Sequence, residues 1–174
     1  MSFVGRLAAV AGGTVLAAGA LAATAAPAQA YSPNPSMAKY YYDTDGCPCS
    51  GGNLTDPFDG TYFAHDAGGL AVKMELTRSG AFLGKVEFHP YGEKLWVYDT
   101  ANDGDGYYVK VSYTSGGTTH NLGPFTPPGT SAVLDYSVKD LDIPEGAYVD
   151  ISVYDDAGLS DLIGAARGTG AAVA

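Results

Sequence analysis

Apolar residues recur at every second position over much of the chain after Leu70, which is the period of a β-strand with one buried face. Turn residues separate these runs, and no sustained helical period follows residue 30. We therefore expect an all-β domain, an antiparallel immunoglobulin-like β-sandwich, with a small β-barrel as the alternative. The alternating runs and one less regular segment span residues 70–77, 82–88, 94–99, 107–113, 118–125, 134–138 and 149–153.

The run 94–99 is apolar on both faces, because Leu95 and Val97 alternate with Trp96 and Tyr98. Two apolar faces are typical of a strand inside a sheet. Packing in the core is the favoured interpretation of Trp96 and Tyr98, and exposure to a sugar ligand is the alternative. Pro124 excludes the segment 118–125 from the middle of a sheet.

The string from Leu141 to Val153, LDIPEGAYVDISV, resembles the corner before a late strand of fibronectin type III and other immunoglobulin-like sandwiches. In those folds a Leu, a Pro-Gly turn and a Tyr join the two sheets. The resemblance implies a packing role for Tyr148, whose hydroxyl would bond a backbone group upstream.

The first thirty residues have the features of a secretory signal peptide. Arg6 supplies a basic start, an apolar run follows, and Ala28-Gln29-Ala30 is an A-x-A cleavage site. A retained membrane anchor is the alternative, but Ala, Gly and Thr dominate the run and no basic cluster follows it. We expect cleavage before Tyr31, a secreted product, and no membrane association afterwards.

The remaining chain divides into three parts by composition. Residues 31–68 are rich in Asp, Tyr and Gly and predict an irregular N-terminal arm, with one short edge strand near 39–42 or 61–64. Residues 69–165 form the predicted sandwich. Residues 166–174 are mostly Gly and Ala and predict a flexible tail.

Acidic residues dominate the charge. The chain has 9 Lys and Arg against 19 Asp and Glu, a formal net charge of −10 at pH 7. Such a charge repels phosphate backbones and anionic lipid surfaces, which argues against nucleic acid as a partner.

One acidic segment, Asp99 to Gly106, has the composition of a calcium-binding loop. Asp99, Asn102, Asp103 and Asp105 offer oxygen ligands within seven residues, and calcium takes six to eight oxygens. The spacing is not that of an EF-hand. The alternative is a long hairpin loop in which Asp and Asn bond their own backbone.

Cys47 and Cys49 are the two cysteines, and they are separated only by Pro48. Export to an oxidising compartment favours a disulfide between them, although a ring this small lies near the limit of disulfide geometry. Pairing between molecules, and free thiols or a metal clip, are the alternatives. A redox enzyme would usually show C-x-x-C at the start of a helix.

Among the many tyrosines, Tyr108 and Tyr154 alternate out of phase with the neighbouring valines and are therefore candidate ligand-binding residues. No P-loop, Rossmann, zinc-protease or nucleophile-elbow motif is present. The sequence predicts a non-catalytic binding domain for an extracellular or cell-envelope polysaccharide, without a cofactor unless calcium binds. A protein-interaction or inhibitor domain is the second hypothesis, and a hydrolase with an unrecognised site is the third.

The Ala-rich leader and the string KVEFHPYGEKLWVYDTANDG together resemble the small secreted proteins of unknown function found in Streptomyces and related actinobacteria. The resemblance lies in the signal peptide, size, acidity and short strands punctuated by Gly and Asp. It implies export, and no functional residue follows from it.

Overall fold

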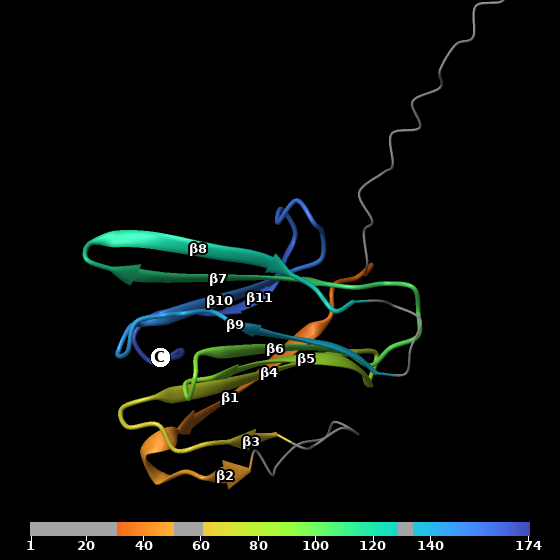
Figure 1. The fold of residues 1–174 in the computed structure, drawn as a ribbon. Helices are drawn as coiled ribbons and strands as arrows, with labels where there is room; N and C mark the ends of the chain where they lie inside the picture. The colour runs from red at the N-terminus through yellow and green to blue at the C-terminus, as the bar shows by residue number, and fades with distance from the viewer. Residues whose placement is uncertain (1–30, 51–60, 129–133) are drawn as a thin grey trace, which may run out of the picture.

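The structure, a computed structural model, describes residues 31–50, 61–128 and 134–174 and is all-β (Figure 1). Its strands form two antiparallel sheets and a short two-stranded layer. Within the described residues the one helical element is the 3-10 turn η1 (Thr44–Gly46). The prediction of an all-β fold with two antiparallel sheets is confirmed.

The larger sheet has five strands in the order β1-β4-β5-β6-β9. These are β1 (Ser36–Asp43), β4 (Leu70–Arg78), β5 (Ala81–His89), β6 (Lys94–Asp99) and β9 (Asp135–Asp140). Ser79 and Gly80 connect β4 to β5 with φ angles of 51° and 82°. Positive φ at both central residues is what a tight type I′ hairpin turn requires, and Gly80 adopts it without steric cost.

The smaller sheet has four strands in the order β11-β10-β7-β8. These are β7 (Tyr108–Ser115), β8 (Thr118–Phe125), β10 (Val149–Tyr154) and β11 (Leu162–Ala166). The strand with Pro124 is at the edge of this sheet, as predicted.

The strand order does not confirm an immunoglobulin-like arrangement. Three consecutive strands, β4, β5 and β6, are neighbours in one sheet. The immunoglobulin constant-type fold divides its strands as ABED and CFG, so no three consecutive strands share a sheet there.

The hydrophobic core lies between the two sheets and is built mainly from the alternate positions that the sequence pattern predicted. Each fully buried Val, Leu, Ile or Phe side chain contributes about 1.5–3 kcal/mol relative to exposure. The core positions on the strands are Val72, Met74, Leu76, Leu83, Val86, Phe88, Leu95, Val97, Val109, Val111, Val149, Ile151, Val153 and Ala166. Ala166 lies in the segment that was predicted to be a flexible tail.

Tyr107, just before β7, connects the two sheets across this core. Its hydroxyl lies within hydrogen-bonding distance of two carbonyl oxygens, that of Lys85 at 3.1 Å and that of Tyr98, and shares its one hydrogen between them. Gly84 makes room for the ring, because a Cβ at this position would collide with the Tyr98 carbonyl and the Tyr107 hydroxyl. The glycine therefore fixes where the tyrosine crosses from one sheet to the other.

The N-terminal arm contains more regular structure than predicted. Strand β1 pairs with β4 along all eight of its residues, and it includes the predicted edge segment 39–42. Strands β2 (Cys49–Ser50) and β3 (Tyr62–Phe63) form a third layer against the outer face of the five-stranded sheet, below β1 and β4 in Figure 1. The buried Phe63 ring anchors this layer by packing against Ala71 of β4.

The outer face of the five-stranded sheet carries four charged residues that are nevertheless buried: Lys73, Glu75, Lys85 and Glu87. The register places Lys73 opposite Glu87 and Glu75 opposite Lys85, so opposite charges alternate over the face. The alternation predicted their outward direction correctly. Their burial was not visible in the sequence. Lys85 and Glu87, for example, bond Thr61, which lies more than twenty residues away along the chain.

Two predictions at the end of the chain differ from the structure. The tail is packed, since Ala171, Ala172 and Ala174 are buried and Val173 bridges Leu70. Alanine is small enough to fill the space between the sheets, so a run without large apolar residues can still be core. Tyr148 does not have the packing role implied by the immunoglobulin corner, because its side chain is 55% exposed.

Candidate functional site

Three aromatic side chains gather on the outer face of the five-stranded sheet: Trp96 and Tyr98 of β6, and Tyr136 of β9. Their ring centroids lie 5.9–6.0 Å apart in all three pairs, and their planes are within 28° of parallel. Tyr136 is exposed and the other two are half-buried. We call these three residues the aromatic platform.

The alternation within β6 and its register with β9 explain this arrangement. Leu95 and Val97 point into the core, so Trp96 and Tyr98 must point to the opposite face. Tyr98 lies directly opposite Tyr136 in the neighbouring strand. The sequence favoured packing of Trp96 and Tyr98 in the core between the sheets. The structure instead places both rings on the outer face of the five-stranded sheet.

Tyr136 is the member of the platform that the sequence analysis missed. The alternation grouped it with Leu134 and Val138 as one apolar face. In the structure Leu134 and Tyr136 are exposed and Val138 is half-buried. The pairing of β6 with β9 joins segments almost forty residues apart, and nothing in the local pattern announces such a partner.

A buried polar cluster lies beside the platform. Lys85 Nζ is 4.7 Å from the centroid of the Tyr98 ring, 2.8 Å from Glu87 Oε1 and 3.0 Å from Thr61 Oγ1. Glu87 Oε2 is 3.1 Å from His89 Nε2, and the His89 ring is 5.9 Å from the Trp96 ring. The cluster therefore contacts both half-buried rings of the platform.

Glu87 remains ionised in this cluster. Burial alone would raise its pKa, but the hydrogen bond to His89, the charge of Lys85 and the bonds from Lys85 and Thr61 outweigh burial and lower that pKa. A general acid for glycoside hydrolysis has a raised pKa and faces its substrate. Glu87 is buried and paired, which suits a role in positioning the rings.

The acidic segment from Asp99 to Gly106 connects β6 in one sheet to β7 in the other. It is a crossover between sheets and not the hairpin loop considered from the sequence. Asp99 Oδ1 accepts from the Ala101 amide at 3.0 Å, and Asp103 Oδ1 accepts from the Asp105 amide at 3.1 Å. These are the local backbone bonds that Asp commonly makes in turns.

Calcium binding by this segment stays a prediction. Asn102 and Asp103 are exposed, whereas Asp99 is buried at the end of β6. Across residues 31–50, 61–128 and 134–174, no three His, Cys, Asp or Glu side chains converge in a way that suits a metal ion.

Asp99 has an unusual environment. Burial raises its pKa to about 6, and the charges of Asp103, Asp135 and Asp105 add to this effect, against the lowering effect of the Ala101 amide. The second carboxylate oxygen, Oδ2, has no hydrogen-bond partner among the described residues. An ionised Asp99 is therefore poorly stabilised.

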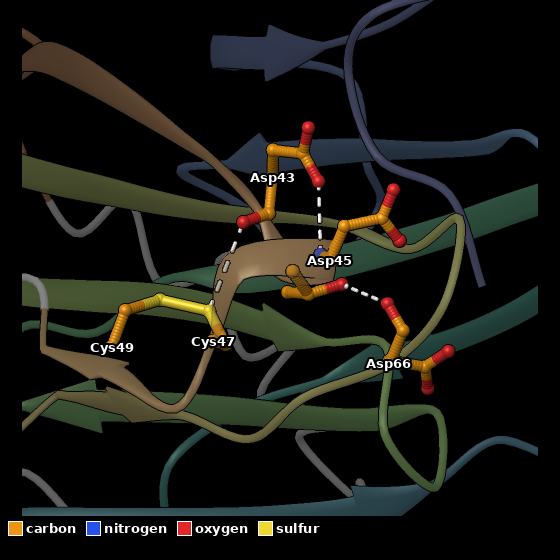
Figure 2. Close-up of a disulfide and its surroundings, with 6 residues drawn as sticks. Asp43, Asp45, Cys47, Cys49 and Asp66 are labelled. Atoms are coloured by element: carbon orange, nitrogen blue, oxygen red, sulfur yellow. Dashed lines mark hydrogen bonds between the residues drawn. A yellow bond between two sulfur atoms is a disulfide. The ribbon is translucent and has the colours of Figure 1, made fainter.

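Cys47 and Cys49 are joined by a disulfide next to η1 (Figure 2). Figure 2 shows the sulfurs on one side of the 3-10 turn and the carboxylates of Asp43, Asp45 and Asp66 on the other. The Asp43 carboxylate accepts from the Asp45 amide at 2.9 Å and so caps the turn. This corner begins the third layer that ends in β3.

Tyr108 and Tyr154, the candidate ligand-binding residues from the sequence, are directly opposed in the pairing of β7 with β10. Both are half-buried. They alternate with Val109 and Val153, which point into the core, so they lie on the outer face of the four-stranded sheet. The structure thus brings the two residues together, on the side of the molecule opposite the aromatic platform.

A hollow of about 320 Å³ lies beside the four-stranded sheet. Most of its lining side chains carry hydroxyl groups, and one carries a carboxylate: Ser112, Tyr113, Thr114, Thr119, Tyr148, Asp150 and Thr169. Asp150 already accepts a hydrogen bond from the Gly168 amide at 2.8 Å. Tyr113 and Tyr148 also contribute rings to the hollow, and the Tyr113 ring stacks on His120 with the centroids 4.7 Å apart. The platform differs in that three rings are mutually near-parallel.

No family model, curated protein or solved structure matches this chain. The fold therefore defines its class: the protein is an all-β protein with two antiparallel sheets. In the part of the chain that the structure describes, no helix is long and apolar enough to cross a membrane.

Proposed function

We propose that the protein is a secreted, non-catalytic binding domain for a polysaccharide, and that the aromatic platform is its contact surface. The observation that carries this proposal is the near-parallel arrangement of Trp96, Tyr98 and Tyr136 on the outside of the sheet. A pyranose ring has an apolar C–H face and a hydroxyl rim. Tyr and Trp offer flat apolar faces with a polar group at the edge.

The charge of the molecule narrows the ligand class. A net charge of −10 at pH 7 disfavours acidic polysaccharides. Three neighbouring rings make a surface larger than one sugar ring, which favours a chain over a free monosaccharide. We therefore propose a neutral glycan chain as the ligand. Export through the N-terminal signal peptide would place the domain where such chains occur.

A matched pair of tyrosines tests this proposal. Tyr136 on the platform is 51% exposed and Tyr148 at the hollow is 55% exposed, so replacing either by Ala removes a similar surface ring. We expect Tyr136→Ala to weaken binding to insoluble neutral glycans about tenfold, which corresponds to about 1.4 kcal/mol. Tyr148→Ala should bind like the unmodified protein.

Tryptophan fluorescence gives an independent readout, because Trp96 is the single Trp of the chain. A soluble oligosaccharide bound at the platform should shift or quench its emission, with a midpoint that agrees with the pull-down. Parallel measurements in calcium and in EDTA test whether the acidic segment contributes.

Other outcomes point to other functions. Binding that is lost in Tyr148→Ala and retained in Tyr136→Ala would move the site to the hollow. Saturable binding to a protein and none to glycans would support an interaction or inhibitor domain. Release of soluble sugar from the glycan would indicate a hydrolase.

A further inference from the structure

The backbone nitrogen of Tyr31 is held by the side chain of Asp155. It lies 2.9 Å from Asp155 Oδ1 and 3.1 Å from Oδ2, so both carboxylate oxygens face the same nitrogen. Tyr31 is 2% exposed and Asp155 0% exposed. The Tyr31 side chain belongs to the main core, which fixes the position of its backbone.

Tyr31 is also the residue that follows the A-x-A site at Ala28-Gln29-Ala30. In the uncleaved chain its nitrogen is an amide with one hydrogen. Hydrolysis of the Ala30–Tyr31 bond by water would leave a carboxylate on Ala30 and an ammonium group on Tyr31. An ammonium offers three hydrogens and a positive charge to the same two oxygens.

We infer that removal of the leader creates a buried ion pair between the new α-ammonium group of Tyr31 and the carboxylate of Asp155, and that the fold is completed by this pair. The Asp155 carboxylate is then a binding site for the α-ammonium group of a chain that begins at Tyr31. The inference depends on cleavage before Tyr31 and not on polysaccharide binding.

The surroundings of Asp155 favour a cation. Burial raises the pKa of Asp155, the charges of Asp161, Asp105 and Asp156 raise it further, and the Tyr31 amide only partly offsets this. Burial raises the pKa of the Tyr31 hydroxyl, and the charges of Asp103, Asp99 and Asp105 in the crossover segment raise it further. Arg78 is the cation placed against this ring, with its guanidinium carbon 5.6 Å from the ring centroid. A positive charge at the Tyr31 nitrogen would therefore enter a strongly negative environment.

A second contact ties the same segment to the same loop. Asn34 Nδ2 donates to Asp161 Oδ1 at 2.7 Å, while Asp161 O accepts from the Asp155 amide at 2.8 Å. The start of the mature chain is thus held to the 155–161 loop at two points. Only the contact at Tyr31 would change its charge on cleavage.

The ion pair between the Tyr31 ammonium group and the Asp155 carboxylate determines how stability should change with pH. An ammonium beside a carboxylate has a pKa above its ordinary value of about 7.7–8.0. The added stability is then fully present below about pH 7.7 and is lost as the pH rises through the folded-state pKa of the amine.

The test compares a chain that begins at Tyr31 with one that begins at Ala30, whose Tyr31 nitrogen remains an amide. We expect the α-amino pKa of the Tyr31 chain, measured by NMR, to be raised by at least one unit. A shift of one unit makes the Tyr31 chain more stable at low pH. Its unfolding equilibrium constant should be at least tenfold smaller at pH 6 than at a pH above the shifted pKa. The Ala30 chain should lack this pH dependence.

Two variants provide the controls. Asp155→Asn should return the α-amino pKa to its ordinary range, whereas Asp161→Asn removes a neighbouring charge and should leave a raised pKa. If Asp155→Asn does not fold, the comparison between the chain that begins at Tyr31 and the chain that begins at Ala30 still tests the inference. Equal unfolding constants and equal pH profiles for the two starts would overturn the inference, as would an exported protein whose N-terminal residue is not Tyr31.

Discussion

At the scale of single residues, Asp99 shows a conflict between burial and charge. It ends β6 at the point where the chain leaves one sheet for the other, and its first oxygen caps the turn that follows. The second oxygen lacks a partner among the described residues. The position needs an acceptor for the turn, but it does not need a negative charge.

We therefore expect Asp99→Asn to stabilise the protein at pH 7 by about 1–2 kcal/mol, because Asn keeps the acceptor and removes the charge. Burial raises the pKa of Asp99 from 3.8 to about 6. For an acid with a raised pKa, stability is lost as the pH rises from about 4 to about 6 and is then constant. Urea unfolding at pH 4, 5, 6 and 7 measures this difference between the two proteins.

Asp103→Asn is the matched control. Asp103 is exposed in the same segment and also accepts one local amide bond. This variant should change stability by less than about 0.5 kcal/mol. A destabilised Asp99→Asn protein at pH 7 would mean that the carboxylate has a partner which outweighs its burial.

At the scale of elements, the third layer depends on one side chain. Phe63 of β3 is fully buried, with its ring 5.1 Å from Tyr42 and 4.7 Å from His89. Because His89 also contacts Trp96, this layer supports the platform through a continuous row of rings.

Phe63→Ala should lower the free energy of unfolding by about 3–5 kcal/mol, the usual cost of emptying a buried aromatic site. The adjacent Tyr62 is exposed, and Tyr62→Ala should change that free energy by less than about 0.5 kcal/mol. Denaturant unfolding measures both. Equal effects of the two substitutions would show that the third layer does not contribute to the stability of the sheet.

The main strands could be predicted because the alternation of apolar and polar residues is visible within each strand. Alternation in β4, β5, β7 and β10 separates an inner face from an outer one. The packed tail could not be predicted, because Gly and Ala have no strong period and only the space between the sheets makes them core. The burial of Lys85 and Glu87 was missed for a related reason, since both bond Thr61, which is distant in the sequence.

The candidate site was only partly predictable. The sequence singled out aromatic residues as possible ligand contacts, but Tyr136 joins Trp96 and Tyr98 only through the register of β6 with β9. Which face of β6 lies inside was also ambiguous, because both faces are apolar. In β6 the branched aliphatic residues Leu95 and Val97 face the core, and the larger rings of Trp96 and Tyr98 lie on the outer face.

At the scale of the whole molecule, the net charge of −10 is unevenly placed. Five carboxylates gather at one end of the sandwich, where their charges raise the pKa of one another or of Tyr31: Asp99, Asp103, Asp105, Asp155 and Asp161. Repulsion among them opposes folding, and salt screens it: the Debye length falls from about 30 Å at 0.01 M to about 3 Å at 1 M.

We therefore expect sodium chloride to raise the melting temperature over this range by roughly 4 °C, about the effect of 1 kcal/mol in a domain of this size. Calcium chloride at equal ionic strength separates screening from binding. A larger rise in calcium would support the predicted ligands Asp99, Asn102, Asp103 and Asp105. A fall in melting temperature with sodium chloride would contradict the repulsion argument.

The outermost strands of the sandwich have a further consequence for how copies of the molecule behave toward one another. Strands β1 and β11 lie side by side at one margin, where Lys39 Nζ donates to the Ala165 carbonyl at 2.9 Å. At the other margin β8 carries Pro124, which has no amide hydrogen, and its register with β7 shifts near that point. Strand β9 carries charges along its edge. Among the four outer strands of the two described sheets, a second copy therefore finds no uninterrupted edge to extend, and we expect concentrated solutions to resist strand-by-strand aggregation.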